Sequence, residues 1–250
     1  MTSRAGDTAS GQPGTATDVI AHRLYQAGCR FAFGIPGGEV IAMMDSLERA
    51  GIRFVLVKHE NAAGFMAEGV YQMTGAPAVL VTTVGPGLAN AFNVIANAEQ
   101  DRVPMIVLSG CVDSEEALTY NHQIFDHAAV LKPVTKATFT LGDAAADVLA
   151  DKAVALALEQ RPGPVHIDLP ITRQDKPAAV SGMAGRVPSS LVGPVDPDLA
   201  KARDWFEKAR RPVMIAGLDV LTQGGAESVG NFVREHGIPL IRSEEHTSEL

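Results

Sequence analysis

The sequence predicts an α/β fold in which helices cover both faces of a parallel sheet. Short apolar segments alternate with helical patterns from residue 17 to about residue 170. These apolar segments are continuous rather than alternating, as in strands that are buried on both faces. Turns rich in Gly and Pro separate several of them from the helices that follow. Together these observations indicate strands joined by crossover helices.

Each element is expected from its own pattern. Thr17 or Asp18 can cap a first helix that runs to Ala27, because their side-chain oxygens can accept from free N–H groups. The other elements are assigned by periodicity and by turn residues. Strands are predicted at 31–33, 54–57, 78–82, 105–109, 136–141 and 165–169, and helices at 40–49, 61–74, 88–100 and 144–160.

The chain is expected to hold two domains. Residues 1–16 are polar and predict a disordered lead-in, and 17–170 form the first domain. The stretch 171–197 is rich in Pro, Gly, Ser and Ala and indicates a linker. Residues 198–241 then predict an incomplete second α/β domain, with helices at 198–209 and 226–236 and strands at 213–216 and 239–241.

The last residues have an unusual composition. The segment 242–250, "RSEEHTSEL", closely resembles the conceptual translation of a sequencing-library adapter. We therefore expect it to be non-native, with the natural sequence ending by about Ile241 in a truncated gene. A genuine hydrophilic tail is the alternative.

Composition excludes several classes of protein. The 250 residues carry a formal charge of −8, which argues against nucleic acid as a partner. No apolar run approaches the roughly 20 residues of a membrane span, and the first residues lack the apolar core of a secretory signal. Cys29 and Cys111 make no metal-ligand spacing and are expected to be packed thiols. We therefore expect a cytoplasmic protein that has no membrane partner.

Three loops at predicted strand ends carry unusual residues. They are "GIPGGE" at 34–39, His59-Glu60, and "TTVGPGLAN" at 82–90. Ligands of open α/β sheets bind outside the carboxyl ends of the strands, so these loops can share one pocket. An acid where a strand runs into a helix could also be a helix cap. If Val57, Ala62 and Ala63 shield Glu60, it could instead exchange a proton near neutral pH.

Several catalytic motifs are absent. His59-Glu60 is not a zinc-protease motif, because Ala63 stands where the second histidine belongs. The chain has no Walker A loop, no Gly-x-Ser-x-Gly elbow and no Gly-x-Gly-x-x-Gly fingerprint. No metal ligands are assigned to this chain.

Four blocks together resemble a known family. They are "FGIPGGEV", "KHENAAGFMAEGVYQMTG", "TTVGPGLANAFNVIANAEQDRVPMIVLSG" and "RPGPVHIDLP". In order and spacing they are similar to the N-terminal, pyrimidine-binding domain of thiamine diphosphate enzymes, in the acetolactate synthase and pyruvate oxidase-like branch. The resemblance covers roughly residues 17–241.

The resemblance implies roles for named residues. In that family the glutamate of the His-Glu block contacts N1′ of the cofactor's aminopyrimidine and promotes formation of the ylide, which makes Glu60 the expected catalytic residue. Cofactor contacts are implied for Pro36, Gly37, Thr83, Pro86, Gly87 and Asn90. Substrate-side positions are implied for Gly38, His122 and Gln123.

Departures from the family's patterns narrow the implied chemistry. Pyruvate decarboxylase-like relatives carry Asp where this chain has Gly38, and benzoylformate decarboxylase-like relatives carry His where it has Thr83. Both differences favour the carboligase or oxidase branch. Ile124 stands where acetolactate synthases show Glu, which leaves the substrate open.

The implied function is that of an acetolactate synthase-like carboligase acting on a 2-oxoacid, as a homodimer or homotetramer when full length. Magnesium would be held by a Gly-Asp-Gly motif that this chain lacks, so the chain alone is expected to be inactive. Whether the second domain binds FAD is open. The alternatives are a related decarboxylase, oxidase or CoA-linked lyase, and a non-catalytic nucleotide-binding module.

Overall fold

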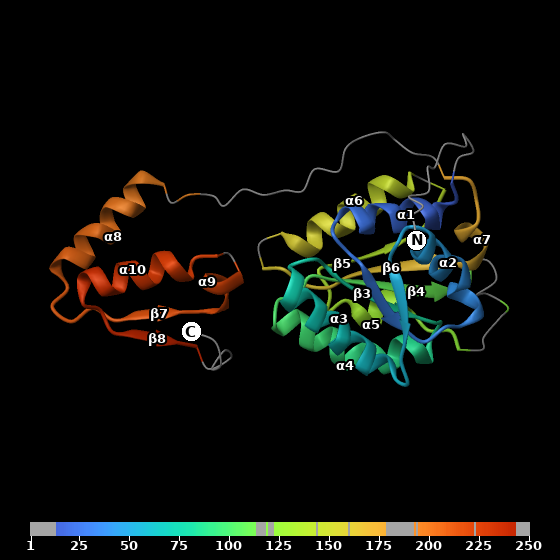
Figure 1. Ribbon diagram of the computed structural model, residues 1–250, viewed down its shortest axis with the longest axis horizontal. Helices are drawn as coiled ribbons and strands as arrows, with labels where there is room; N and C mark the ends of the chain where they lie inside the picture. Colours follow the sequence, from blue (N-terminus) through green and yellow to red (C-terminus); the bar gives the residue numbers. More distant parts are fainter. Residues whose placement is uncertain are drawn as a thin grey trace, which may run out of the picture. The chain divides into compact units, whose positions relative to one another are not determined.

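The chain divides into two compact units, residues 1–189 and 190–250. The computed structural model describes residues 14–113, 119, 123–143, 145–159, 161–178, 193, 195–222 and 224–243. Figure 1 shows the helices and strands of both units.

The described part of the first unit contains a six-stranded parallel sheet in the order β2-β1-β3-β4-β6-β5. Its strands are β1 (Phe31–Gly34), β2 (Arg53–Leu56), β3 (Ala78–Thr82), β4 (Met105–Cys111), β5 (Ala137–Thr140) and β6 (Val165–Pro170). The direction in which successive strands are added reverses at β1, because β2 lies on one side of it and β3 on the other. Ligands of open α/β sheets bind at the carboxyl ends of strands beside such a reversal. The topology therefore points to the ends of β1 and β3.

Helices cover both faces of this sheet, which confirms the predicted fold class (Figure 1). The helices are α1 (Ala16–Gln26), α2 (Ile41–Arg49), α3 (Glu60–Thr74), α4 (Pro86–Gln100), α5 (His127–Leu131), α6 (Ala146–Leu158) and α7 (Ile171–Gln174), with a 3₁₀ turn η1 (Gly38–Val40). Helices α1, α2 and α6 enclose one cluster of buried side chains, which includes Ile20 and Met43. Helices α3, α4 and α5 enclose the other, which includes Leu88 and Leu131.

The first helix is capped by Thr15, and the predicted cap at Thr17 or Asp18 is wrong. The Thr15 hydroxyl accepts from the N–H of Asp18 at 3.2 Å, and the Asp18 carboxylate accepts from the N–H of Thr15 at 3.1 Å. This reciprocal pair satisfies two N–H groups at once, which a cap at Thr17 could not do. Thr17 is buried instead and donates to the carbonyl of Gln174.

Strand β2 differs from the prediction in burial. The apolar run 54–57 was expected to be buried on both faces, but β2 is an edge strand and Leu56 is 65% exposed. An apolar run does not reveal whether a strand has neighbours on both sides. The edge position of β2 is set by the strand order.

Other boundaries shift for local reasons. Helix α4 starts at Pro86, two residues before the predicted start, because proline at the first helical position loses no hydrogen bond. Helices α5 and α7 were not predicted. Helix α7 lies in the predicted linker but packs on the first unit, where the Gln174 amide donates to the carbonyl of Leu169 at 3.0 Å.

The second unit has the start of an α/β pattern. It contains α8 (Asp196–Lys208), β7 (Met214–Ala216), α9 (Leu218–Thr222), α10 (Ala226–His236) and β8 (Leu240–Arg242). Strands β7 and β8 pair in parallel, so the elements between them form a βαβ crossover. The domain boundaries proposed above remain predictions.

Helices α3 and α4 approach closely at Gly64. A Cβ added there would lie 2.2 Å from Val94 Cγ1, whereas one added at Gly69 of the same helix would meet nothing within 4 Å. We expect Gly64→Ala to destabilise the chain by roughly 1–3 kcal/mol, because the added methyl overpacks a stiff β-branched neighbour.

Gly69→Ala is the matched control. It should stabilise the chain by roughly 0.5–1 kcal/mol, because alanine loses less backbone entropy in a helix than glycine does. Urea unfolding of both variants, followed by circular dichroism, gives the two free energies of unfolding. Equal effects at the two positions would contradict the close helix contact.

Candidate functional site

Glu60 is buried at the junction between β2 and α3. It is the first residue of α3 and only 5% exposed. The N-cap of this helix is His59, whose Nδ1 accepts from the N–H of Asn61 at 3.1 Å. The interpretation of Glu60 as the cap of α3 is therefore replaced by one in which His59 has that role.

The carboxylate of Glu60 points toward α4. The side-chain amide of Asn90 donates to Glu60 Oε2 at 3.2 Å, and a Cβ on Gly87 would lie 3.5 Å from Glu60 Oε1. Val57 and Ala63 are buried nearby, as expected, but Ala62 is exposed and does not shield the acid. Helical geometry explains this, because Ala62 and Ala63 project 100° apart around α3.

Thr83 and Glu39 connect the ends of β3 and β1. The Thr83 hydroxyl donates to Glu39 Oε2 at 2.6 Å. A Cβ on Gly37 would lie 2.3 Å from Thr83 Oγ1, and one on Gly87 would lie 2.7 Å from Thr83 Cγ2. The two glycines therefore let their backbone pack directly against Thr83, which a side chain at either position would prevent.

Glu39 was not singled out from the sequence, although it belongs to "GIPGGE". Three elements hold it: Gln174 donates to its carbonyl at 2.6 Å, Thr83 binds its carboxylate, and its Cβ lies against Gly110. The signal available in the sequence was an acid directly after a Gly-Gly pair at a strand end.

Five other residues were predicted for the site: Pro36, Pro86, Gly38, Gln123 and His122. Pro36 and Pro86 are exposed at the ends of β1 and β3. Gly38 is exposed, and a Cβ there would meet nothing within 4 Å, so glycine is not sterically required. Gln123 has a positive φ of 60°, and its carbonyl packs against Gly85. His122 lies outside the described residues.

A cavity of about 570 Å³ opens at the carboxyl ends of β4, β5 and β6. Its lining includes Cys111, Phe125, His127, Asp168 and Arg173, and, among the described residues, none of the site residues predicted from the sequence. We place the candidate active site at Glu60, Asn90, Thr83 and Glu39, because these polar groups converge at the reversal of strand order. Val84, next to Thr83, lines the cavity and marks where the two regions meet.

Three titratable groups meet beside this cavity. His127 Nδ1 lies 2.7 Å and His166 Nε2 lies 3.4 Å from Asp168 Oδ1. Their ligand atoms are close enough together to hold a metal ion. The 2.7 Å contact is a hydrogen bond that occupies two of those atoms, so we interpret His127 and Asp168 as a hydrogen-bonded pair with His166 packed beside it. Sequence reasoning missed all three residues.

The two thiols have unreactive environments. Burial raises the pKa of Cys29 to about 12. Burial and the negative charges of Asp168 and Asp113 raise the pKa of Cys111. Reactive cysteines have a lowered pKa, so neither thiol is a candidate nucleophile. This agrees with the prediction of packed thiols, although Cys111 also lines the cavity.

Residues 14–130 match the family model of the thiamine pyrophosphate enzyme N-terminal domain, described as a TPP-binding domain. This range contains Glu60, Asn90, Thr83 and Glu39. The chain belongs to the thiamine pyrophosphate enzyme family. Thiamine pyrophosphate is the compound called thiamine diphosphate here.

Relatives place the chain in the acetolactate synthase-like branch of this family. It is 30% identical over 238 residues to the acetolactate synthase large subunit IlvG of Mycobacterium tuberculosis, covering 94% of this chain and 44% of the relative. It is 34% identical over 204 residues to the catabolic acetolactate synthase of Raoultella terrigena, covering 80% and 36%. The match to a probable 2-ketoarginine decarboxylase of Pseudomonas aeruginosa is 34% over 224 residues, covering 85% and 39%.

A solved structure supports membership in the thiamine diphosphate enzyme family. A protein described as thiamin diphosphate-dependent, from Mycobacterium smegmatis, superposes with a TM-score of 0.83 at 27% identity. The match covers 92% of this chain and 44% of that one. The chain thus spans less than half the length of the relatives that it matches.

Among the described residues, no helix is both long enough and apolar enough to cross a bilayer.

Proposed function

We propose that this chain is the pyrimidine-binding part of a thiamine diphosphate-dependent enzyme, an acetolactate synthase-like carboligase. The full-length enzyme would decarboxylate a 2-oxoacid and transfer the resulting acyl unit to an acceptor. The observation that carries the proposal is the buried carboxylate of Glu60, held by Asn90 beside the reversal of strand order.

The residues present fit an aminopyrimidine ring. A buried carboxylate can hold a ring nitrogen, and Gly37 and Gly87 let the backbone pack directly against Thr83 beside it, where a Cβ would clash. When bound, thiamine diphosphate supplies an electron sink for the carbanion left by decarboxylation. Glu60 would hold a proton at N1′ of the ring, and Asn90 would fix the orientation of the carboxylate.

The surroundings of Glu60 suit this role. Val57 and Ala63, its neighbours in sequence, are also buried, and a carboxylate shielded from water interacts more strongly with a bound ring. Thr83, which binds Glu39, would contact the cofactor. Gly38, His122 and Gln123 would lie on the substrate side. Pro36 and Pro86 would flank the ring.

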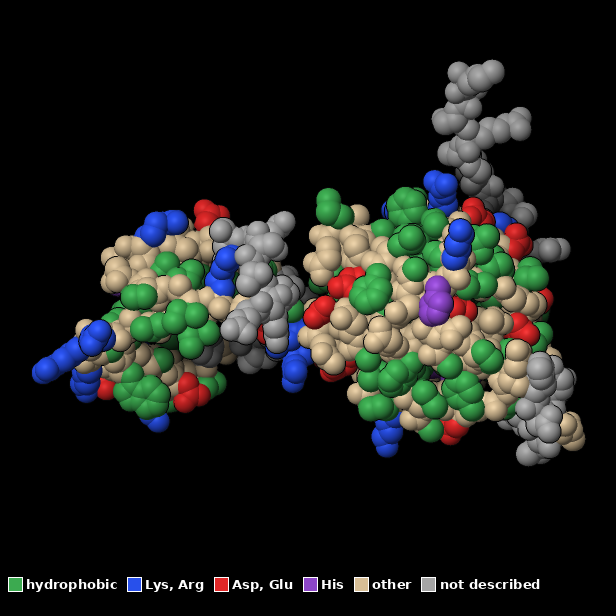
Figure 2. All heavy atoms as spheres, turned by 90° about the horizontal axis from the view of Figure 1, so that it is seen from below, with side chains coloured by type: hydrophobic (Ala, Val, Ile, Leu, Met, Phe, Trp, Pro, Cys, Tyr) green, Lys and Arg blue, Asp and Glu red, His purple; other side chains and the backbone are tan. Residues whose placement is uncertain are grey.

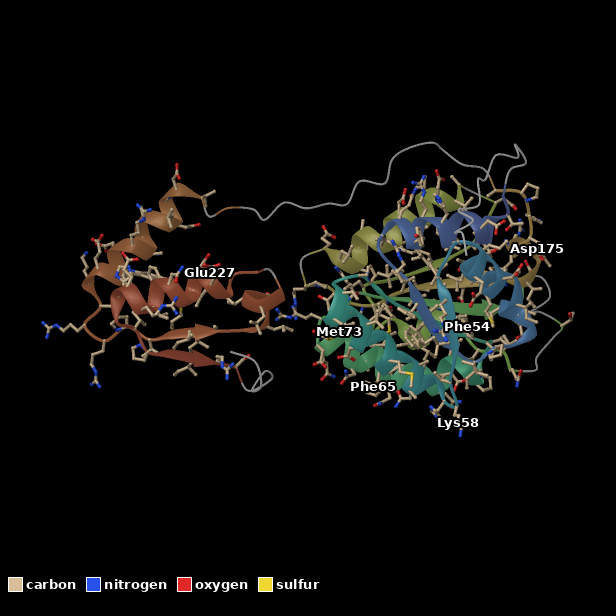
Figure 3. The ribbon with its side chains drawn as sticks, viewed as in Figure 1. Phe54, Lys58, Phe65, Met73, Asp175 and Glu227 are labelled. Carbon is tan, nitrogen blue, oxygen red and sulfur yellow. The ribbon has the colours of Figure 1, made fainter. Side chains whose placement is uncertain are left out.

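The remaining parts of the enzyme belong to the same proposal. Magnesium and the diphosphate would be held outside this chain. The second domain of the full-length enzyme could bind FAD. The two free thiols suit a cytoplasmic location. Three exposed apolar side chains on α3 suit contact with another subunit: Phe65, Met66 and Met73. Figure 3 labels Phe65 and Met73, and Figure 2 shows apolar side chains exposed on the face of the molecule seen from below. A homodimer or homotetramer would cover them.

A second candidate function is decarboxylation of a 2-oxoacid with a cationic side chain. Glu39 favours it, because this carboxylate has no ion pair among the described residues and lies beside Thr83. The relative named for 2-ketoarginine gives the substrate to try.

The experiment uses a full-length enzyme that carries this chain, supplied with thiamine diphosphate and magnesium. Pyruvate and 2-ketoarginine are compared as substrates, and products are identified by mass spectrometry. Acetolactate from pyruvate supports the carboligase, and an aldehyde from 2-ketoarginine supports the second candidate. No cofactor-dependent turnover of either, or of other 2-oxoacids, would favour a non-catalytic module. The 250-residue chain alone should be inactive.

A further inference from the structure

His127 connects β6 to the turn between β3 and α4. It begins α5 and is 4% exposed. Its Nδ1 lies 2.7 Å from Asp168 Oδ1, and its Nε2 lies 3.2 Å from the backbone nitrogen of Gly85. A backbone N–H can only donate, so Nε2 must accept, and the ring proton must sit on Nδ1 and be donated to Asp168. The two contacts together define a neutral ring in one tautomer.

Gly85 depends on contacts from outside its own segment. Its φ is 54° and its ψ is −104°, and no side chain caps the helix that starts after it. A Cβ there would lie 1.9 Å from the carbonyl oxygen of Gln123. The buried N–H of Gly85 is instead bound by His127. The turn is thus held by the segment that follows Gln123, far away in sequence.

The orientation of the His127 ring is fixed from several sides. Phe125 lies edge-on to it, with ring centroids 5.0 Å apart. His166 lies at 6.0 Å and is fully buried, without a hydrogen-bond partner for either ring nitrogen among the described residues. Burial lowers the pKa of His166 to about 4, so its ring is neutral at pH 7. The hydrogen bond to Asp168 is made by His127. The imidazole cannot turn without breaking both of its hydrogen bonds.

The turn held in this way carries two residues of the candidate active site. Gly85 lies between Thr83, which binds Glu39, and Gly87, which faces Glu60. We propose that His127, oriented by Asp168, is a positioning residue that fixes the 83–87 turn through the N–H of Gly85. Its consequence for cofactor binding rests on the proposed function. The hydrogen-bond chain itself does not.

The first experiment uses the ¹⁵N-labelled 250-residue chain at pH 7. Long-range ¹H–¹⁵N spectra identify the His127 tautomer, which should carry its proton on Nδ1. A proton on Nε2 would overturn the proposal without any variant. Hydrogen exchange of the Gly85 amide is then compared with that of Val107 in β4, which reports on the intact sheet.

Two substitutions separate positioning from simple packing. In His127→Leu the Gly85 amide should exchange roughly tenfold faster while Val107 is unchanged, because a hydrogen bond of ordinary strength is lost. His127→Gln should restore much of the protection, since its amide can accept from Gly85 and donate to Asp168. His22→Leu, at an exposed histidine of α1, is the control. Unchanged Gly85 exchange in His127→Leu would overturn the proposal.

The last measurement is made in a full-length enzyme. The apparent affinity for thiamine diphosphate should fall roughly tenfold in His127→Leu and recover in His127→Gln. An unchanged affinity would overturn the positioning role. Failure of the proposed function would look different: the parent enzyme would not bind thiamine diphosphate, while the tautomer and the Gly85 exchange would be as predicted.

Discussion

Glu60→Gln in a full-length enzyme should slow exchange of the thiazolium C2 proton of bound thiamine diphosphate by roughly 10²–10⁴-fold, the range typical of a positioned acid or base. An amide keeps the size and the hydrogen bond to Asn90, but it cannot take up and release a proton. The fold should survive, because Gln can still accept from the Asn90 amide. Deuterium exchange followed by NMR after acid quenching measures the rate.

Helix α3 offers a matched control in Glu68. The amide of Asn97 donates to Glu68 Oε2 at 3.2 Å, which repeats the pairing of Asn90 with Glu60 two helical turns away. Burial, followed by the charge of Asp101, raises the pKa of Glu68. Glu68→Gln thus removes an acid from the same helix and the same type of pair, and should leave C2 exchange unchanged. If Glu60→Gln also exchanges at the parent rate, Glu60 is not the catalytic acid.

The first unit should lose on the order of 3 kcal/mol of stability as the pH falls from 6.5 to 4, through His166. Burial is the main reason that the pKa of this histidine is lowered from 6.5 to about 4, and the attraction of Asp168 does not offset it. Below pH 6.5 the unfolded chain therefore takes up a proton that the folded chain does not. This contribution is complete above pH 6.5 and is lost progressively toward pH 4.

His166→Leu should remove this pH dependence. Neither ring nitrogen has a hydrogen-bond partner among the described residues, so an apolar side chain of similar size leaves no donor unpaired there. His22→Gln, at an exposed position, should leave the dependence as it is. Urea unfolding between pH 4 and 7.5, followed by the amide signals of β4, gives the free energies of unfolding. If the free energy of unfolding depended on pH in the same way for the parent and His166→Leu, His166 would not be the source of the pH dependence.

Much of the fold could be predicted because local signals and tertiary structure agree. Strand β3 was predicted with the bounds found, since its apolar run is buried on both faces between β1 and β4. Strand β2 has an equally apolar run, yet it lies at the edge with Leu56 exposed. Composition reports hydrophobicity, whereas the number of neighbouring strands is decided by the order of the sheet.

In the candidate site, too, some residues could be identified from the local sequence and others depend on the tertiary structure. Glu60 could be identified from the sequence because a carboxylate at a strand-to-helix junction interrupts an otherwise apolar pattern. Its partner Asn90 could be proposed only through the resemblance, since 30 residues separate them and the contact depends on how α3 packs on α4. Gly64 permits that packing.

The sequence by itself determined the alternation of strands and helices, the three unusual strand ends, and the family to which they belong. Only the tertiary structure decided that Glu39 binds Thr83, and that Asp168 and His127 reach Gly85. The physical reason is distance along the chain. Helical and strand periods act over a few residues, while these hydrogen bonds join positions 41 to 44 residues apart that meet only when parallel strands align their carboxyl ends.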